Sequence, residues 1–307
     1  MKINDHVYVA TVNLIEGIDV NTFLVQGDED AVLIDSGVKT MAADIDRLVE
    51  ESGAKQKLKA LMNSHAHVDH IGSNGHIVQK YGVPVIAPLG ARAWIEDFSV
   101  HYREFCLLYP DIFPDTPDLR NELFPLLDNE TRVFQEITEG TTFDLGGGVR
   151  LETLWLPGHV FYEVGFFERK TRTLILGDAI TGYNWSLIHG HVTRRGYLNT
   201  LHKLESFIRT RGVNQVVTGH FAPTDATGAI EHIQAARAYV YTLDETIQNI
   251  LQEGAPKSLG VVWREVCRTL NKIEEFRGLT TVDAHLKEGL QDGRFVLQGG
   301  LYRTATR

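Results

Sequence analysis

The stretch SHAHVDHIG occupies residues 64–72 and places three histidines and one aspartate within six positions. It follows the apolar run LKALMN, which indicates a buried strand that ends where the histidines begin. In an extended segment, side chains at i and i+2 point the same way, so His65 and His67 can share one metal ion. Asp69 and His70 fall beyond the bend and can face a second ion. A solvated loop that happens to be rich in histidine is the alternative interpretation.

Three later strand-like runs also end in a possible metal ligand. LPGH ends at His159, TLILGD at Asp178 and VVTGH at His220. Taken alone, each would more simply be a structural histidine or a turn aspartate. Together with residues 65–70 they supply imidazole nitrogens and carboxylates, which a borderline cation such as zinc prefers. We therefore expect a metal site, and the number of ligands is sufficient for two ions.

The pattern along the chain predicts an α/β fold, because strand-like runs alternate with helical ones over the first 228 residues. Residues 98–138 interrupt this alternation with four prolines and many aromatic and leucine side chains, which predicts an insertion packed beside the site. From residue 229 to 307 the chain is expected to be a helical extension, with helices over 229–254 and 261–276 and a short extended tail. The domain organisation is thus 1–228 with an appended 229–307.

Composition narrows the classes of function. The 307 residues carry a formal net charge of −10 and no lysine or arginine cluster longer than the pair Arg194 and Arg195, which argues against a nucleic-acid groove. No apolar run is long enough to span a membrane, and the first ten residues lack a signal-peptide pattern. The two cysteines, Cys106 and Cys267, show no paired spacing. We expect a cytoplasmic protein with free thiols.

The ordered motifs resemble those of the metallo-β-lactamase superfamily. SHAHVDHIG is similar to its HxHxDH signature and is followed by LPGH, LILGD and TGH over roughly residues 7–222. The resemblance implies an αββα sandwich with a metal site along one edge. It also implies how the ligands divide: the first metal takes His65, His67 and His159, the second takes Asp69, His70 and His220, and Asp178 bridges both.

The resemblance extends to residues that are not ligands. Asp35 in LIDSG matches an acidic residue that supports the motif loop by hydrogen bonding, although a plain turn aspartate is nearly as good an interpretation. Tyr183 follows the bridging aspartate, as a catalytic tyrosine does in lactonases of the superfamily, but at a different spacing, and it can equally pack a loop. A departure is PGHVFYEVGF, where Val160, Phe161 and Tyr162 replace the usual Thr/Ser-Pro-Gly.

Several histidines outside the motifs need no catalytic role. His191 lies in a second HxH pattern with His189, but no aspartate-histidine follows, so both are expected to be pocket or surface residues. The remaining histidines of this kind are interpreted as solvated or packed: His76, His101, His202, His232 and His285.

The most favoured function is a hydrolase with two divalent ions, most simply zinc, with manganese or iron as alternatives. A hydroxide bridging the ions would attack the carbonyl of a lactone, thioester or other activated ester, with Asp69 orienting it. The partner is then a small acyl substrate, with no nucleic acid and no membrane, and a second copy of the chain is a candidate. The alternative is a mononuclear iron oxidoreductase of the persulfide dioxygenase type. Nucleic-acid processing and β-lactam hydrolysis fit the charge and the N-terminus less well.

Overall fold

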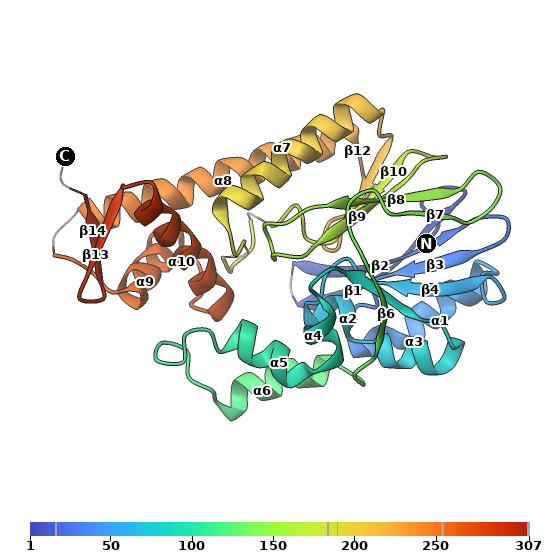
Figure 1. Ribbon diagram of the computed structural model, residues 1–307, viewed down its shortest axis with the longest axis horizontal. Helices are drawn as coiled ribbons and strands as arrows, with labels where there is room; N and C mark the ends of the chain where they lie inside the picture. The colour runs from blue at the N-terminus through green and yellow to red at the C-terminus, as the bar shows by residue number, and fades with distance from the viewer. Residues whose placement is uncertain (16, 183, 189, 253–254, 306–307) are drawn as a thin grey trace.

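Two six-stranded sheets form the centre of the molecule. The computed structural model describes residues 1–307 except 16, 183, 189, 253–254 and 306–307. The first sheet has the order β1-β2-β3-β4-β5-β6 and the second the order β12-β11-β10-β9-β8-β7. Figure 1 shows helices on the outer side of each sheet, which confirms the expected αββα sandwich.

The first sheet is antiparallel at its beginning and parallel from β3 onward. Its strands are β1 (Val7–Ile15), β2 (Ile18–Gln26), β3 (Ala31–Ile34), β4 (Leu58–Met62), β5 (Val85–Pro88) and β6 (Val133–Ile137). The outer helices on this side are η1 (Lys39–Met41), α1 (Ala42–Glu51), α2 (Val68–Ile71) and α3 (Asn74–Tyr81). Strand β4 is buried at four of its five positions, because its neighbours β3 and β5 pair with it on both sides.

The second sheet is mostly antiparallel, and only β10 and β11 pair in parallel. Its strands are β7 (Thr142–Asp144), β8 (Arg150–Trp155), β9 (Val164–Glu168), β10 (Thr173–Ile175), β11 (Gln215–Val217) and β12 (Thr224–Asp225). Helices α7 (Arg194–Arg211) and α8 (Ala226–Gln252) cover its outer face (Figure 1). Apolar side chains from both sheets, including Phe23, Met62, Phe166 and Val217, interdigitate as the central core.

The segment between β5 and β6 is largely helical. It contains α4 (Arg92–Glu96), α5 (Phe98–His101), the π-helical turn η2 (Tyr102–Cys106), α6 (Pro117–Leu123) and η3 (Phe124–Leu126). Its apolar side chains, among them Tyr102, Cys106 and Leu119, pack together with Phe276 of the C-terminal region. The last residues of the expected insertion, 133–138, differ from the rest because β6 pairs with β5 and completes the first sheet.

The C-terminal region packs α9 (Leu259–Leu270) and α10 (Phe276–Gln291) against the end of α8, followed by the hairpin β13 (Phe295–Gln298) and β14 (Leu301–Thr304). Helix α8 begins at residue 226 and runs through the expected domain boundary at 228. The single helix predicted over 261–276 was wrong, because Asn271 adopts a left-handed conformation with φ 52° and ends α9. In the described part of the chain, no helix is long and apolar enough to cross a membrane.

Candidate metal centre

The histidine motif begins shortly beyond β4. His67 is the N-cap residue of the short helix α2, with extended backbone, so His65 and His67 precede the helix and Asp69 and His70 lie within it. The loop is held by buried amides and hydroxyls: Asn63 Nδ2 donates to the carbonyl of His70, and Ser36 Oγ donates to Asn74 Oδ1 at 2.7 Å. These bonds satisfy the polar groups of an almost fully buried loop and fix its course.

The structure brings all the predicted ligands to one place. The potential donor atoms of His65, His67, His159 and Asp178 lie within 4.8 Å of one another, and so do those of Asp69, His70 and His220. His159 Nε2 is 2.9 Å from His67 Nδ1. His220 Nε2 is 3.4 Å from Asp69 Oδ2. Four strand ends far apart in the sequence therefore supply two adjacent groups of metal-binding atoms.

Asp178 lies between these two groups. Its Oδ2 is 3.4 Å from His159 Nε2 and 3.2 Å from His220 Nε2, and its Oδ1 is 3.3 Å from His70 Nε2. The neighbouring glycine at 219 is required by this arrangement, since a Cβ there would lie 2.7 Å from His70 Cε1 and 2.8 Å from Asp178 Oδ1. The carboxylate is thus positioned to contact a cation in either group.

The outer ring nitrogens of the histidines are oriented by hydrogen bonds. His159 Nδ1 donates to the carbonyl of Gly190 at 2.7 Å, and His220 Nδ1 donates to the carbonyl of Asp19 at 2.7 Å. His70 Nδ1 is 2.8 Å from Asp35 Oδ2. A carbonyl or carboxylate on one ring nitrogen fixes the tautomer and directs the other nitrogen to the centre, as in metal-binding histidines generally.

Asp35 supports the motif loop. It follows β3 in a left-handed conformation, φ 59°, and is completely buried. Its Oδ1 accepts from the backbone N–H of Ser64 and its Oδ2 from the Ser64 hydroxyl, both at 2.7 Å, in addition to the contact with His70. The left-handed backbone costs on the order of 1 kcal/mol or more. The hydrogen bonds that the buried carboxylate makes with these three groups offset that cost.

Burial and charge divide the histidines by protonation. Burial lowers the pKa of His65 and of His67 well below the usual range, and it lowers the pKa of His159, so these rings are neutral at physiological pH. Burial opposes charge on His70 and His220 as well, but Asp178 raises the pKa of both. Burial likewise opposes charge on Asp178, but His220 and His70 hold its pKa well below the usual range.

The residues present fit a metal ion. His65 Nε2 is buried and has no hydrogen-bond partner within the described residues, whereas its Nδ1 lies 3.1 Å from Ser64 Oγ. An unsatisfied buried nitrogen costs free energy, and a cation held with His67, His159 and Asp178 would remove that cost. Neutral imidazoles beside an ionised carboxylate are also the chemical form that coordinates divalent metals.

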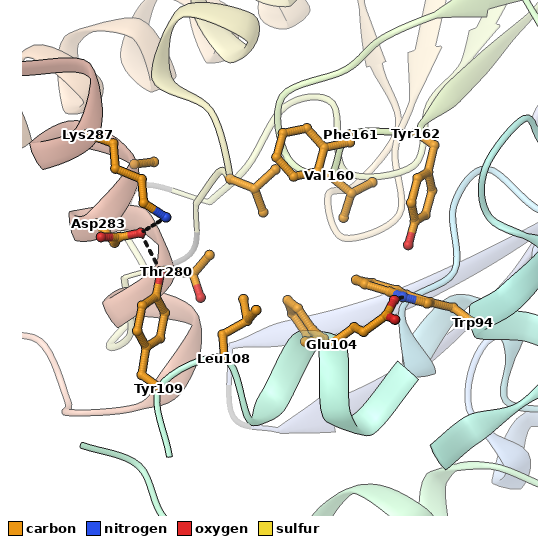
Figure 2. A pocket seen from close by; sticks show the side chains of 13 residues that line it. Trp94, Glu104, Leu108, Tyr109, Val160, Phe161, Tyr162, Thr280, Asp283 and Lys287 are labelled. Atoms are coloured by element: carbon orange, nitrogen blue, oxygen red, sulfur yellow. Dashed lines mark hydrogen bonds and ion pairs between the residues drawn. The ribbon is translucent and has the colours of Figure 1, made fainter. Parts of the chain in front are cut away.

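Three cavities adjoin the centre. The largest, about 270 Å³, is mainly apolar and is drawn in Figure 2 between the segment after β5, the loop at 160–162 and α10. It shares Phe105, Val192 and Thr280 with a small cavity that His67 and His159 line. A third, also small, is lined by His67, Asp69, Asp178 and Phe105. Phe105 stacks on His67 with ring centroids 4.3 Å apart and separates the large cavity from the metal centre.

Tyr183 and His189 fall outside the described residues. Val160, Phe161 and Tyr162, noted as a departure from the usual motif, line the large cavity (Figure 2).

Two histidines that needed no function, His191 and His285, form a buried pair with Nε2 atoms 2.9 Å apart. This contact between the two rings joins the loop after β10 to α10. The spacing of the two histidines in the sequence does not predict it.

Arg277 was not predicted to be near the site, because it follows the unforeseen start of α10. It lines both small cavities.

Comparison with known proteins agrees with this geometry. A sequence model described as the metallo-beta-lactamase superfamily matches residues 15–220. The chain is 28% identical to the probable metallo-hydrolase YflN of Bacillus subtilis over 158 residues. This match covers 48% of this chain and 55% of YflN. It is also 28% identical over 163 residues to the hydroxyacylglutathione hydrolase GloC of Haemophilus influenzae, covering 52% of this chain and 66% of GloC. The matches thus leave a third or more of each relative uncovered.

Solved structures match over almost the whole chain. The metallo-beta-lactamase family protein TTHA1429 from Thermus thermophilus superposes with a TM-score of 0.78 at 19% identity, covering 99% of this chain and all of that one. A beta-lactamase domain protein from Burkholderia ambifaria gives 0.77 at 17% identity, covering 99% of this chain and 94% of that one. At such identities the similarity concerns the fold alone, C-terminal helices included.

Proposed function

Because the chain belongs to the metallo-beta-lactamase superfamily, we propose that it is a metal-dependent hydrolase of a lactone, thioester or other activated carboxylic ester. The observation that carries the proposal is the position of Asp178 between two groups of ligand atoms. A larger cavity, on the other side of Phe105, is suited to an acyl or aryl group. Two divalent ions, zinc or alternatively manganese or iron, would supply an activated water and polarise the carbonyl.

The protein's own residues have separate tasks in this proposal. His65, His67 and His159 would hold one ion through neutral imidazoles, His70, His220 and Asp69 would hold the other, and Asp178 would contact both. Asp69 is the most exposed of these side chains, at 20%, and it lines the small cavity that Asp178 and Phe105 also line. It is therefore positioned to accept a hydrogen bond from the attacking water and to orient it toward the substrate.

The cavity supports a carboxylic substrate with an apolar part. Its walls include Trp94, Phe105, Leu108, Val160 and Tyr162, and it shares Phe105, Val192 and Thr280 with the small cavity that His67 and His159 line. An acyl or aryl group lodged there would place its carbonyl beside the ligand atoms. Tyr183 stays a candidate donor to the leaving group. The iron oxidoreductase alternative leaves the cluster of Asp69, His70 and His220 without a role.

The test is the initial rate of proton release by zinc-loaded and manganese-loaded protein with lactones, acyl thioesters, aryl esters and phosphodiesters. We expect turnover of one carboxylic class, abolished in Asp178→Ala and retained in Asp5→Ala, whose exposed carboxylate pairs only with Lys2 in the described structure. Metal analysis should find two ions per chain. Turnover of phosphodiesters alone, or a single iron with oxygen consumption, would refute the proposal.

A further inference from the structure

Arg277 is the one lysine or arginine that lines either small cavity at the metal centre, within the described residues. One of these cavities is bounded by His67 and His159, the other by Asp69 and Asp178. Arg277 comes from the beginning of α10, a helix of the C-terminal extension, rather than from the αββα sandwich. An anionic group placed beside the ligand atoms would therefore meet a guanidinium as well as the metals.

The guanidinium lies over the Phe276 ring, 5.1 Å from its centroid, and it is hydrogen-bonded through Nε alone among the described residues. Glu275 caps α10, accepting from the backbone N–H groups of Arg277 and Gly278, and its Oε2 also accepts from Arg277 Nε at 2.6 Å. Within the described residues, neither Nη1 nor Nη2 of Arg277 has a hydrogen-bond partner. Glu275 thus orients the side chain and leaves its terminal nitrogens available, in the fork geometry that recognises a carboxylate.

The one lysine among the described residues that line the large cavity, Lys287, pairs with an acidic neighbour through its charged nitrogen. Lys287 Nζ lies 2.6 Å from Asp283 Oδ2, and the Tyr109 hydroxyl donates to the same oxygen (Figure 2). On the opposite side, Glu104 accepts from the indole of Trp94. Arg277 also has an acidic partner, Glu275, but that contact uses Nε and leaves Nη1 and Nη2 to face a carboxylate. The large cavity is therefore suited to an apolar group, and a carboxylate of the substrate is better matched by Arg277.

We propose that Arg277 binds a carboxylate of the substrate, so that the chain hydrolyses acidic esters, thioesters or lactones that also carry an apolar acyl or aryl group. This substrate class rests on the proposed hydrolase function. The carboxylate and the apolar group would lie on different sides of Phe105, whose ring lines all three cavities. A substrate lacking either part would lose one of two independent contacts.

The test is calorimetric binding of two product-like acids to the zinc-loaded protein. Benzylsuccinate has a benzyl group and two carboxylates, and 4-phenylbutanoate has the same benzyl group and one. We expect the wild-type protein to bind benzylsuccinate at least about tenfold more tightly, as a charge-assisted bidentate pair warrants. Arg277→Gln should abolish this preference without changing zinc content, and Arg277→Lys should restore part of it. Arg209→Gln is the matched control and should leave the preference unchanged, because Arg209 is exposed on α7 and lines none of these cavities.

Equal binding of the two acids by the wild-type protein would overturn the proposal, and so would a preference that survives in Arg277→Gln or binding of neither acid. Because binding is measured without turnover, the result is independent of the ester panel. A chain that hydrolyses esters but shows no Arg277-dependent preference would keep the hydrolase function and lose the substrate class. A preference for benzylsuccinate without turnover of any ester would keep the carboxylate site at Arg277 and lose the hydrolase function.

Discussion

The carbonyl oxygen of Gly190 accepts a hydrogen bond from Nδ1 of His159 at 2.7 Å, and the C-terminal helices hold the loop that carries it. His191 N donates to Thr281 Oγ1 of α10, and its ring pairs with His285 of the same helix. His285 Nδ1 lies 2.8 Å from Asp244 Oδ1 of α8. The orientation of one candidate ligand thus depends on residues far along the chain, in the C-terminal region.

Replacement of His285 by Leu should weaken metal binding, because His191 loses its partner and the Gly190 carbonyl loses its support. We expect zinc affinity to fall by about tenfold or more, the range seen when outer hydrogen bonds of metal-binding histidines are removed. Competition with a chromophoric chelator would measure it. His76→Leu is the matched control, since His76 pairs with Asp46 away from the centre. A lower melting temperature with unchanged zinc affinity would contradict the expectation.

Replacement of Asp35 by Asn should affect both stability and metal binding. Asn tolerates the left-handed backbone, but its amide cannot accept from Ser64 and His70 as a carboxylate does. We expect the free energy of unfolding of the metal-free protein to fall by about 2 kcal/mol, measured by urea denaturation. The second ion, which His70 would hold, should also be lost more readily. An unchanged unfolding midpoint would show that Asp35 is a plain turn residue.

Metal binding should release protons and strengthen as pH rises. His70 and His220 have a raised pKa in the metal-free protein, against the effect of burial, because Asp178 favours their charged form. That charge stabilises the metal-free fold below the unfolded pKa of about 6.5, and the gain is lost as pH rises through the folded pKa values.

Since a metal needs neutral rings, zinc affinity should increase over this same range. Calorimetry in two buffers of different ionisation enthalpy would count the protons. Affinity that does not vary from about pH 6 to pH 9 would show that both rings are already neutral.

Replacement of His101 by Phe should stabilise the protein. Both ring nitrogens of His101 are buried and lack hydrogen-bond partners within the described residues, and the ring stacks on Trp94 at 4.6 Å, which a phenyl ring can reproduce. We expect the free energy of unfolding to rise by about 1 kcal/mol at neutral pH.

The advantage should grow in acid. Burial lowers the pKa of His101 to about 3, so this ring costs the wild-type protein stability as pH falls from about 6.5 toward that value, and the Phe variant lacks this one contribution to acid destabilisation. Urea denaturation at several pH values would measure the difference. A destabilised variant would mean that the ring nitrogens have a partner, such as ordered water, that the Phe side chain removes.

The alternation of strands and helices and the meeting of the ligands could be predicted from the sequence, because the ligands follow the ends of apolar runs and such strand ends share one edge of a sheet. The supporting role of Asp35 came from the resemblance of LIDSG to the superfamily motif, since the residue alone is equally a turn aspartate. The start of α10 could not, since the left-handed Asn271 that interrupts the helical pattern has no strong local signal. Because this break was not predicted, neither Arg277 nor His285 could be assigned to a face of a helix. Their contacts near the metal centre depend on tertiary packing alone.

Helix α8 runs without interruption from the second sheet into the C-terminal bundle, and all the candidate ligands precede it. Four lining residues of the large cavity, Thr280, Asp283, Ala284 and Lys287, follow it, as does Arg277. Under the proposed function, the metal ligands are therefore encoded ahead of α8, whereas the walls of the large cavity are encoded on both sides of it. Recombination within the codons for α8 would exchange one wall of the cavity together with Arg277, and with them the contacts that support the loop carrying Gly190.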